Sequence, residues 1–136
     1  MNKHLRYMVI LLITCVLTSC STQINFSEYI DKNKPLEMMI MKYDSLSQNT
    51  KLIKLSIPAN SDKYKRLIEW AEKNKSGWQS TPASYISEIC ISQGDFRLLY
   101  TPRSSGVVIG FSDVDKQPKQ YSKSIMAGEL DFLGEG

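Results

Sequence analysis

Three methionines close together in the sequence are the first residues whose type and spacing could do chemistry. Met38, Met39 and Met41 carry thioether sulfurs, which are soft ligands of the kind that Cu(I) prefers. They fall in an apolar run, 36–43, that predicts a β-strand, and neighbouring residues of a strand point to opposite faces. Met38 therefore cannot readily join the other two at one metal ion, and we predict that these side chains fill the core instead.

Two carboxylates in a polar stretch near the C-terminal end are a second candidate. Asp113 and Asp115 are spaced like calcium ligands, but the rest of an EF-hand loop is missing. The chain contains no catalytic motif that we can identify. The sequence therefore predicts no metal site, no cofactor and no catalytic residue.

The first twenty residues have the organisation of an export signal. Two basic side chains within the first six residues precede an apolar run, 7–17, which is shorter than the ~20 residues needed to cross a hydrocarbon core. The run ends in Leu17-Thr18-Ser19-Cys20, which resembles the lipobox of bacterial lipoprotein precursors. The alternatives are a signal peptide that is cut elsewhere and a buried N-terminal helix.

The lipobox resemblance implies a lipid anchor at Cys20. In that family the cysteine becomes the first residue of the mature protein and carries two or three acyl chains, which hold a protein durably at a membrane. Residues 1–19 are then a lipoprotein signal peptide. Ser21 follows the cysteine, in place of the aspartate that directs retention in the inner membrane. The resemblance thus implies attachment to the outer membrane, facing the periplasm, in a Gram-negative cell, or to the outer face of the plasma membrane otherwise.

Loss of residues 1–19 would leave a domain without histidine and with few thiol groups. His4 is the only histidine, and Cys15 also leaves, so that Cys90 is the one free thiol once Cys20 is acylated. Neither an intramolecular disulfide nor a site built on histidine is then available, while carboxylate, lysine or tyrosine chemistry stays open. Cys90 lies in an apolar, strand-like run, which predicts a buried and inert thiol. We therefore predict that the protein is not an enzyme.

The charge balance does not favour nucleic acid as a partner. The chain has 17 basic and 14 acidic side chains, and the loss of Lys3 and Arg6 with the signal peptide leaves 15 basic and 14 acidic groups. The net charge falls from +3 to about +1, which is too low to indicate a nucleic-acid-binding surface. The remaining chain has the length of one domain with a modest core.

Residues 36–136 are predicted to form this single small domain, after a lipidated tether at 20–35. The tether contains apolar residues, among them Ile24 and Phe26. These favour docking of the tether on the domain, and the alternative is a free arm that binds a partner.

Hydrophobic periodicity predicts the elements of the domain. One helix begins at Asn60 or Ser61, follows a 3.6-residue apolar stripe and ends at Gly77. Alternating or apolar runs indicate strands at 36–43, 50–57, 85–91, 95–101 and 107–111, with 121–126 as an optional edge strand. The predicted fold is α+β, an antiparallel sheet of about five strands with one packed helix in the order β-β-α-β-β-β.

A second and weaker resemblance concerns function. The spacing Tyr64-x-x-Leu67-x-x-Trp70, followed by Gly77-Trp78, is similar to small bacterial lipoproteins found near toxin-secretion loci. The resemblance implies an immunity lipoprotein that blocks a toxin delivered into the periplasm, and it transfers no functional residues. The alternative is an envelope structural or assembly lipoprotein that binds cell-wall or outer-membrane components.

Three residues are predicted to contact a protein partner. Trp78 follows the helix in a loop, and large aromatic side chains are over-represented among interface hot spots. Its alternative role is a hydrophobic contact at the end of the helix. Tyr100 and Arg103, beside the loop at Pro102, are further candidates for the same surface. The expected partners are thus a membrane and a protein.

Overall fold

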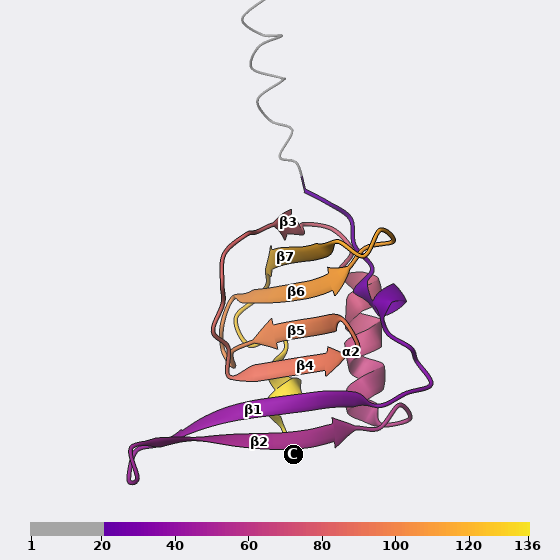
Figure 1. Cartoon of the computed structure of the whole chain (residues 1–136). Helices are drawn as coiled ribbons and strands as arrows, with labels where there is room; N and C mark the ends of the chain where they lie inside the picture. Colours follow the sequence, from indigo (N-terminus) through magenta and orange to yellow (C-terminus); the bar gives the residue numbers. More distant parts are fainter. Residues whose placement is uncertain (1–20) are drawn as a thin grey trace, which may run out of the picture.

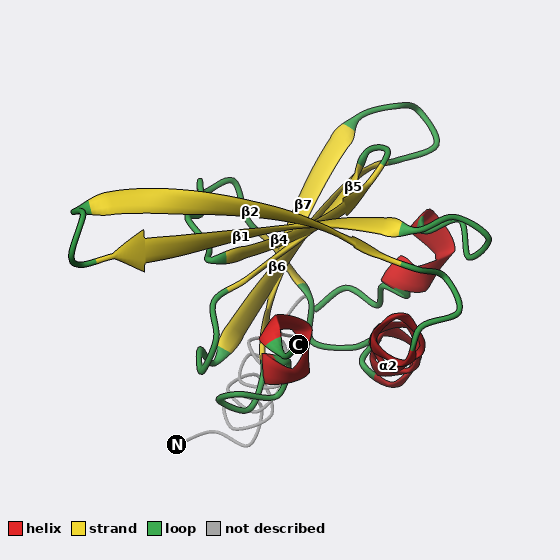
Figure 2. Cartoon of the chain, turned by 90° about the horizontal axis from the view of Figure 1, so that it is seen from below, coloured by secondary structure: helices red, strands yellow, loops and turns green. Residues whose placement is uncertain are grey.

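The structure, a computed structural model, describes residues 21–136. The predicted signal peptide and the predicted lipidation site, Cys20, lie outside this range. Within it, one α-helix and two short 3₁₀ helices lie on one side of an antiparallel sheet (Figures 1 and 2). The fold is α+β, as predicted, although the sheet has seven strands where about five were expected. No helix in residues 21–136 has the length and apolar character needed to span a membrane.

The elements follow one another in an order close to the predicted one. In sequence they are η1 (Phe26–Tyr29), β1 (Leu36–Asp44), β2 (Asn49–Ile57), α2 (Asp62–Lys73), β3 (Gln79–Ser80), β4 (Ile89–Gln93), β5 (Phe96–Tyr100), β6 (Gly106–Ser112), β7 (Pro118–Ser124) and η2 (Asp131–Gly134). In space the strand order is β2-β1-β4-β5-β6-β7-β3. The nine-residue strand β2 therefore forms one edge of the sheet, and the two-residue strand β3 forms the other.

Helix α2 starts where the sequence predicts and ends earlier. The Ser61 hydroxyl caps it by accepting a hydrogen bond from the Tyr64 backbone N–H at 3.3 Å. The last helical residue is Lys73, and Asn74 leaves the helical conformation. Gly77, the predicted end, has φ of +82° and lies in the turn that leads to β3.

The segment before β1 belongs to the body of the domain. Ile24, Phe26 and Ile30 are buried in the core. Phe26 stacks on Phe96 at a centroid distance of 5.3 Å and meets the edge of Trp78 at 6.2 Å. The packed domain thus begins near Thr22 rather than at residue 36.

Two strands differ from their predicted positions. The run predicted as a strand at 85–91 pairs only from Ile89 onward, and residues 81–88 have no regular structure. Strand β7 was expected as an edge strand at 121–126, but it spans Pro118–Ser124 and lies inside the sheet. Strand β7 is not at the edge of the sheet because β3 pairs with its outer side, with Gln79 opposite Ser122. A two-residue strand is too short to produce an alternating pattern, so β3 has no signature in the sequence.

Candidate functional site

The two faces of the sheet are covered to very different extents. Helix α2, η1 and η2 pack against one face, which we call the covered face (Figure 2). The other face, which we call the open face, has no helix on it within residues 21–136. Because strand residues alternate between faces, the pairing register assigns each strand side chain to one of the two.

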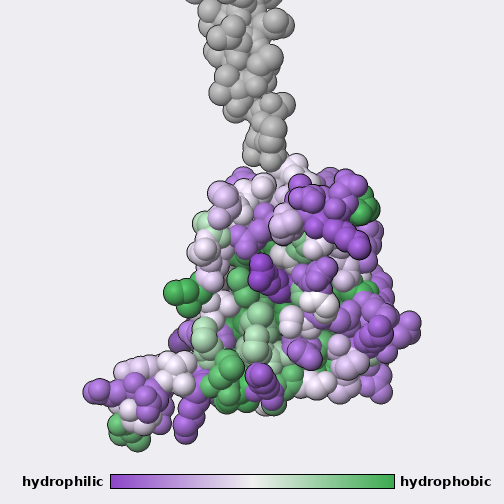
Figure 3. Space-filling model, in the orientation of Figure 1, coloured by the Kyte–Doolittle hydropathy of each residue, from purple (hydrophilic) through white to green (hydrophobic). Residues whose placement is uncertain are grey.

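A row of apolar side chains crosses the middle of the open face. In the register, Met39 of β1 is opposite Cys90 of β4, Cys90 is opposite Leu99 of β5, and Leu99 is opposite Val108 of β6. We call these four residues the apolar row. Lys54 of β2 is opposite Met39 and continues the row to the sheet edge. Figure 3 looks onto this face and shows apolar residues gathered in its lower half.

A polar row runs beside the apolar row on the same face. Glu37, Ser92, Arg97 and Gly110 are opposite one another on β1, β4, β5 and β6. The Arg97 side chain lies directly over Gly110, where an added β-carbon would stand 3.0 Å from the Arg97 Nε atom. Glycine at this position lets the long side chain lie flat on the strand. The open face therefore has a sharp boundary between apolar and polar surface.

The segment 81–88 contacts the open face on its way from β3 to β4. It is held near its start by Gln120, whose amide donates to the carbonyls of Thr81 and Ala83 at 3.2 and 2.6 Å. Near its end, the Glu88 carbonyl accepts from the Met41 backbone N–H at 2.8 Å. Between these points Ile86 is 94% exposed, an unusual position for a large apolar side chain in an ordered segment.

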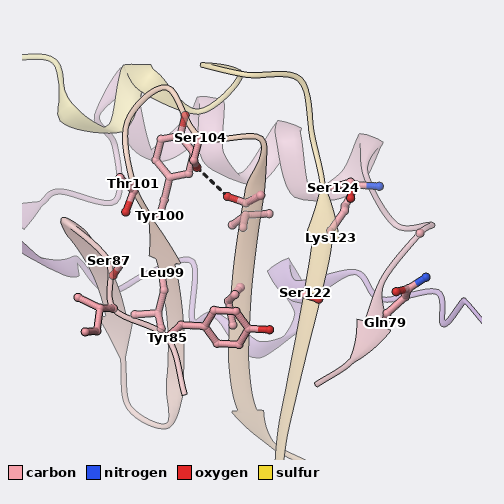
Figure 4. Close-up of a pocket in the computed structure, with 15 residues that line it drawn as sticks. Gln79, Tyr85, Ser87, Leu99, Tyr100, Thr101, Ser104, Ser122, Lys123 and Ser124 are labelled. Carbon is pink, nitrogen blue, oxygen red and sulfur yellow. Dashed lines mark hydrogen bonds between the residues drawn. The ribbon is translucent and has the colours of Figure 1, made fainter. Parts of the chain in front are cut away.

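Two hollows open on either side of the 81–88 segment. One has a volume of about 420 Å³ and extends toward β6, β7 and β3, where Tyr85, Leu99 and Ser122 are in its wall (Figure 4). The other has a volume of about 270 Å³ and extends toward β1 and β2, where Met39 and Leu52 line it. Tyr85 and Leu99 contribute to both hollows. The open face is therefore an uneven surface, with one depression of mixed polar and apolar lining and a smaller one that is mainly apolar.

The β1–β2 hairpin extends the open face beyond the body of the domain. Strand β4 pairs with β1 only at Glu37–Ile40, so residues 41–52 pair with no strand but each other and project outward (Figures 1 and 2). We call residues 41–52 the projecting hairpin. It exposes large apolar side chains, namely Met41, Tyr43, Leu46 and Leu52. Scattered single apolar residues are normal on protein surfaces, but a contiguous group indicates an interaction site.

Charge on the projecting hairpin is mostly positive. Lys42 and Lys51 are opposite each other, and Asp44 is the one acidic residue between 41 and 52. Hydrogen bonds from the Ser47 hydroxyl and the Leu46 backbone N–H lower the pKa of Asp44, whose carboxylate shapes the turn. The two lysines are thus the charges that remain available to a partner.

Two of the three residues predicted to contact a partner belong to the core. Trp78 is 0% exposed, and its indole N–H donates to the Asn74 carbonyl at 2.9 Å. Tyr100 is also buried, and its hydroxyl donates to Asp131 at 2.7 Å. Neither side chain can contact a partner from its position, so the hydrophobic-contact alternative describes Trp78. A loop aromatic beside a helix end was misjudged because the docked N-terminal segment, with Phe26, covers it.

Arg103 is the remaining predicted contact residue, and its side chain is exposed. Its backbone has φ of +64°, which a hydrogen bond from its N–H to Asp131 at 2.7 Å supports. The hydrogen bond from the Arg103 N–H is the largest cause of a lowered pKa at Asp131, and the hydrogen bond from the Tyr100 hydroxyl is the second largest. The pKa of Tyr100 is raised to about 12, mainly because the side chain is buried and secondly because its hydroxyl donates to Asp131. Asp131 therefore acts as a structural acceptor in the described chain.

Cys90, Met39 and Met41 lie outside the core, whereas Met38 is part of it. The Cys90 thiol is only partly buried and lies in the apolar row, which corrects the expectation of a fully buried thiol. Burial still raises its pKa, so the thiol keeps its proton at neutral pH. Met38 is in the core, while Met39 and Met41 lie on the open face. The prediction that Met38 is separated from the other two methionines is confirmed. The prediction that all three side chains fill the core is correct for Met38 alone.

The Asp113 carboxylate is occupied by its own turn. It accepts hydrogen bonds from the backbone N–H groups of Asp115 and Gln117 at 3.0 and 2.8 Å, and Lys119 lies 3.6 Å away. Within residues 21–136 no group of three or more histidine, cysteine or acidic side chains is arranged to hold a metal ion. The most distinctive surface of the described chain is therefore the open face with its projecting hairpin.

Comparison of the chain with protein families, with curated proteins and with solved structures finds no match to any of them. The interpretation of this surface therefore depends on its own chemistry. Sequence reasoning missed the open face, although one signal was present: 36–43 is apolar on both of its faces, and a single predicted helix can cover only one face of a sheet.

Proposed function

We propose that this chain is a lipid-anchored envelope protein that binds another protein through the open face and the projecting hairpin. The observation that supports binding most strongly is the apolar row, which runs across four strands without a helix over it in residues 21–136 and stays partly exposed at Met39, Cys90 and Leu99. The lipobox at Leu17–Cys20 supports the anchor at Cys20. Together they favour a binding module held at a membrane surface.

Within that class, we propose an immunity protein that blocks a secreted antibacterial toxin in the periplasm. Such a protein acts by occupying its target, and it needs a large complementary surface more than reactive groups. The open face offers apolar area and hollows, and the projecting hairpin adds Lys42 and Lys51 on its other side. A specific interface combines apolar area with charged groups at its rim. The Cys90 thiol, which lies in the apolar row, has a pKa raised by burial and so stays protonated at neutral pH. These features favour binding over catalysis.

The anchor is tested by acylation at Cys20. We expect the wild-type protein to carry acyl chains on that residue and to fractionate with membranes, because a cysteine thiol is the group that receives the diacylglycerol. Cys20→Ala should accumulate as the unprocessed precursor. Mass spectrometry of the N-terminal peptide checks this, and acyl mass on another residue or an unmodified soluble wild type would refute the anchor.

The function is tested by competition between strains. If a secreted toxin is encoded beside the gene, a strain that lacks this chain should be killed by a sibling strain that secretes that toxin, and the wild-type chain should restore survival. Survival without the chain would contradict the immunity function. Increased permeability of the outer membrane in the same deletion strain, with unchanged resistance to the toxin, would instead identify the assembly lipoprotein as the better description.

A further inference from the structure

The N-terminal segment is fixed to the domain very close to the proposed acylation site. The Thr22 backbone N–H donates to the Trp78 carbonyl at 2.8 Å, and the Ile24 N–H donates to the Lys75 carbonyl at 2.7 Å. Trp78 is itself buried in the core. Only Ser21 separates Thr22 from Cys20, so the free chain between the acylated residue and the packed domain spans at most about 7 Å.

This attachment point lies at the β3 edge of the sheet. Trp78 directly precedes β3, which is the last strand in the order β2-β1-β4-β5-β6-β7-β3. Six gaps between neighbouring strands separate the two edges, and at ~4.8 Å per gap they amount to about 29 Å. Figure 1 shows the chain entering beside β3, with the projecting hairpin at the opposite end of the molecule.

The chemistry of the β3 edge suits a lipid surface. Residues 73–81 include Lys73 and Lys75 and no acidic side chain. The Lys123 ammonium group also lies there, donating to the Ser76 carbonyl. Lysines at the surface of a membrane are attracted by the anionic headgroups of its lipids. The lysines of this edge therefore favour its approach to an anionic bilayer.

We propose that the β3 edge rests on the anionic lipid headgroups and that the short connection to Cys20 keeps it there. This inference depends on the proposed acylation of Cys20. The sheet then stands with β3 nearest the membrane and β2 farthest from it, about 29 Å away. The open face is turned sideways to the membrane, and the projecting hairpin is held clear of the lipid, where an incoming protein meets it first.

The experiment compares lipid cross-linking at the two edges. The acylated full-length product is reconstituted in vesicles of phosphatidylethanolamine and phosphatidylglycerol, with a photo-reactive benzoylphenylalanine in place of either Gln79 or Leu46. Both side chains are exposed, so neither replacement disturbs the core. A third protein carries the label at Gln79 and a flexible Gly/Ser insertion of roughly 15 residues before Thr22, which adds about 21 Å of r.m.s. length.

We expect the label at Gln79 to form lipid adducts several times more efficiently than the label at Leu46. The insertion should abolish most of that difference, because the domain can then turn away from the bilayer. Equal yields at the two positions, or a yield at Gln79 that the insertion leaves unchanged, would overturn the orientation. Flotation of the protein with the vesicles is measured separately: protein that does not float disproves the anchor itself, whereas floating protein without the difference disproves the orientation alone.

Discussion

The covered face and the open face are built by the same strands, yet one forms a core and the other stays accessible. On the covered face Leu36, Leu98 and Ile109 are fully buried against the helices. On the open face Met39 and Leu99, from the same strands, are only partly buried. The helix, the two 3₁₀ turns and the N-terminal segment suffice to cover one face. The buried core is thus concentrated on one side of the sheet, and the proposed binding surface lies on the other.

Truncation of a core aromatic on the covered side should have the largest effect on stability. Trp78→Ala removes a fully buried side chain and its indole hydrogen bond, so we expect a loss of roughly 3–5 kcal/mol in the free energy of unfolding. Urea denaturation followed by circular dichroism measures this. Val114→Ala is the matched control, because Val114 is 98% exposed, and it should change the free energy by less than about 0.5 kcal/mol.

The hydrogen bond between Tyr100 and Asp131 should have a smaller effect. Tyr100→Phe keeps the buried ring and removes only the hydroxyl, so we expect a loss of about 2 kcal/mol in the free energy of unfolding. A loss as large as that of Trp78→Ala would show that the substitution disturbs the packing of the ring. A loss near zero would show that water replaces the hydroxyl at Asp131.

The same pair predicts a dependence of stability on pH in both directions. The pKa of Tyr100 is raised from 10.0 to about 12 in the folded state, so its contribution is complete below pH 10 and is lost as the pH rises through 12. The pKa of Asp131 is lowered from 3.8, so its contribution is complete above pH 3.8 and is lost as the pH falls through the lower, folded value. Wild type should therefore lose more stability than Tyr100→Phe at both extremes in pH-dependent denaturation curves.

The helix and most strands could be predicted from sequence because local patterns encode them. Ser61 followed by a 3.6-residue stripe defines the start of α2, and alternation defines β2. Strand β3 could not be found, since its two residues are strand only because they pair with β7. The packing of Phe26 against Trp78 is a tertiary contact that no local pattern encodes. Without this contact, the sequence predicts that Trp78 is an exposed aromatic residue in a loop.

The candidate site was harder to predict than the fold. The apolar row joins residues of four strands that lie far apart in the sequence, so it becomes visible only with the strand order and register. The predicted contact residues instead lie near two loops, the one that follows the helix and the one at Pro102, and only the side chain of Arg103 is exposed. Whether a side chain faces the helix or the solvent depends on which face the single helix covers, and the alternation of each strand by itself does not determine this.

The reactivity of Cys90 sharpens the comparison between the faces. Its thiol is partly accessible on the open face but has a raised pKa, so we expect labelling by a maleimide at neutral pH to be several-fold slower than in denaturant. Binding of the partner should slow labelling further, because Cys90 lies in the apolar row. Labelling of the native protein at the denatured rate would contradict the partial burial, and labelling unaffected by a bound partner would place the interface elsewhere.

Charged substitutions on the open face should have the smallest effect on stability. Leu52 and Ile86 are 54% and 94% exposed, so Leu52→Glu and Ile86→Glu should each change the free energy of unfolding by about 0.5 kcal/mol or less. Thermal melts check this expectation. A drop in melting temperature comparable to that of Trp78→Ala would mean that these residues support the fold and that the open face is not free for a partner.

The affinity of these two variants for the toxin is the most direct test of the proposed binding surface. Calorimetric titration with the toxin that the proposed function implies should show that Leu52→Glu and Ile86→Glu each weaken binding by about 2 kcal/mol or more, which is roughly 30-fold. Val114→Glu, a substitution at a 98% exposed position outside the open face, should bind like the wild type. Wild-type affinity in both open-face variants, or an equal loss in Val114→Glu, would contradict the assignment of the open face as the partner-binding surface.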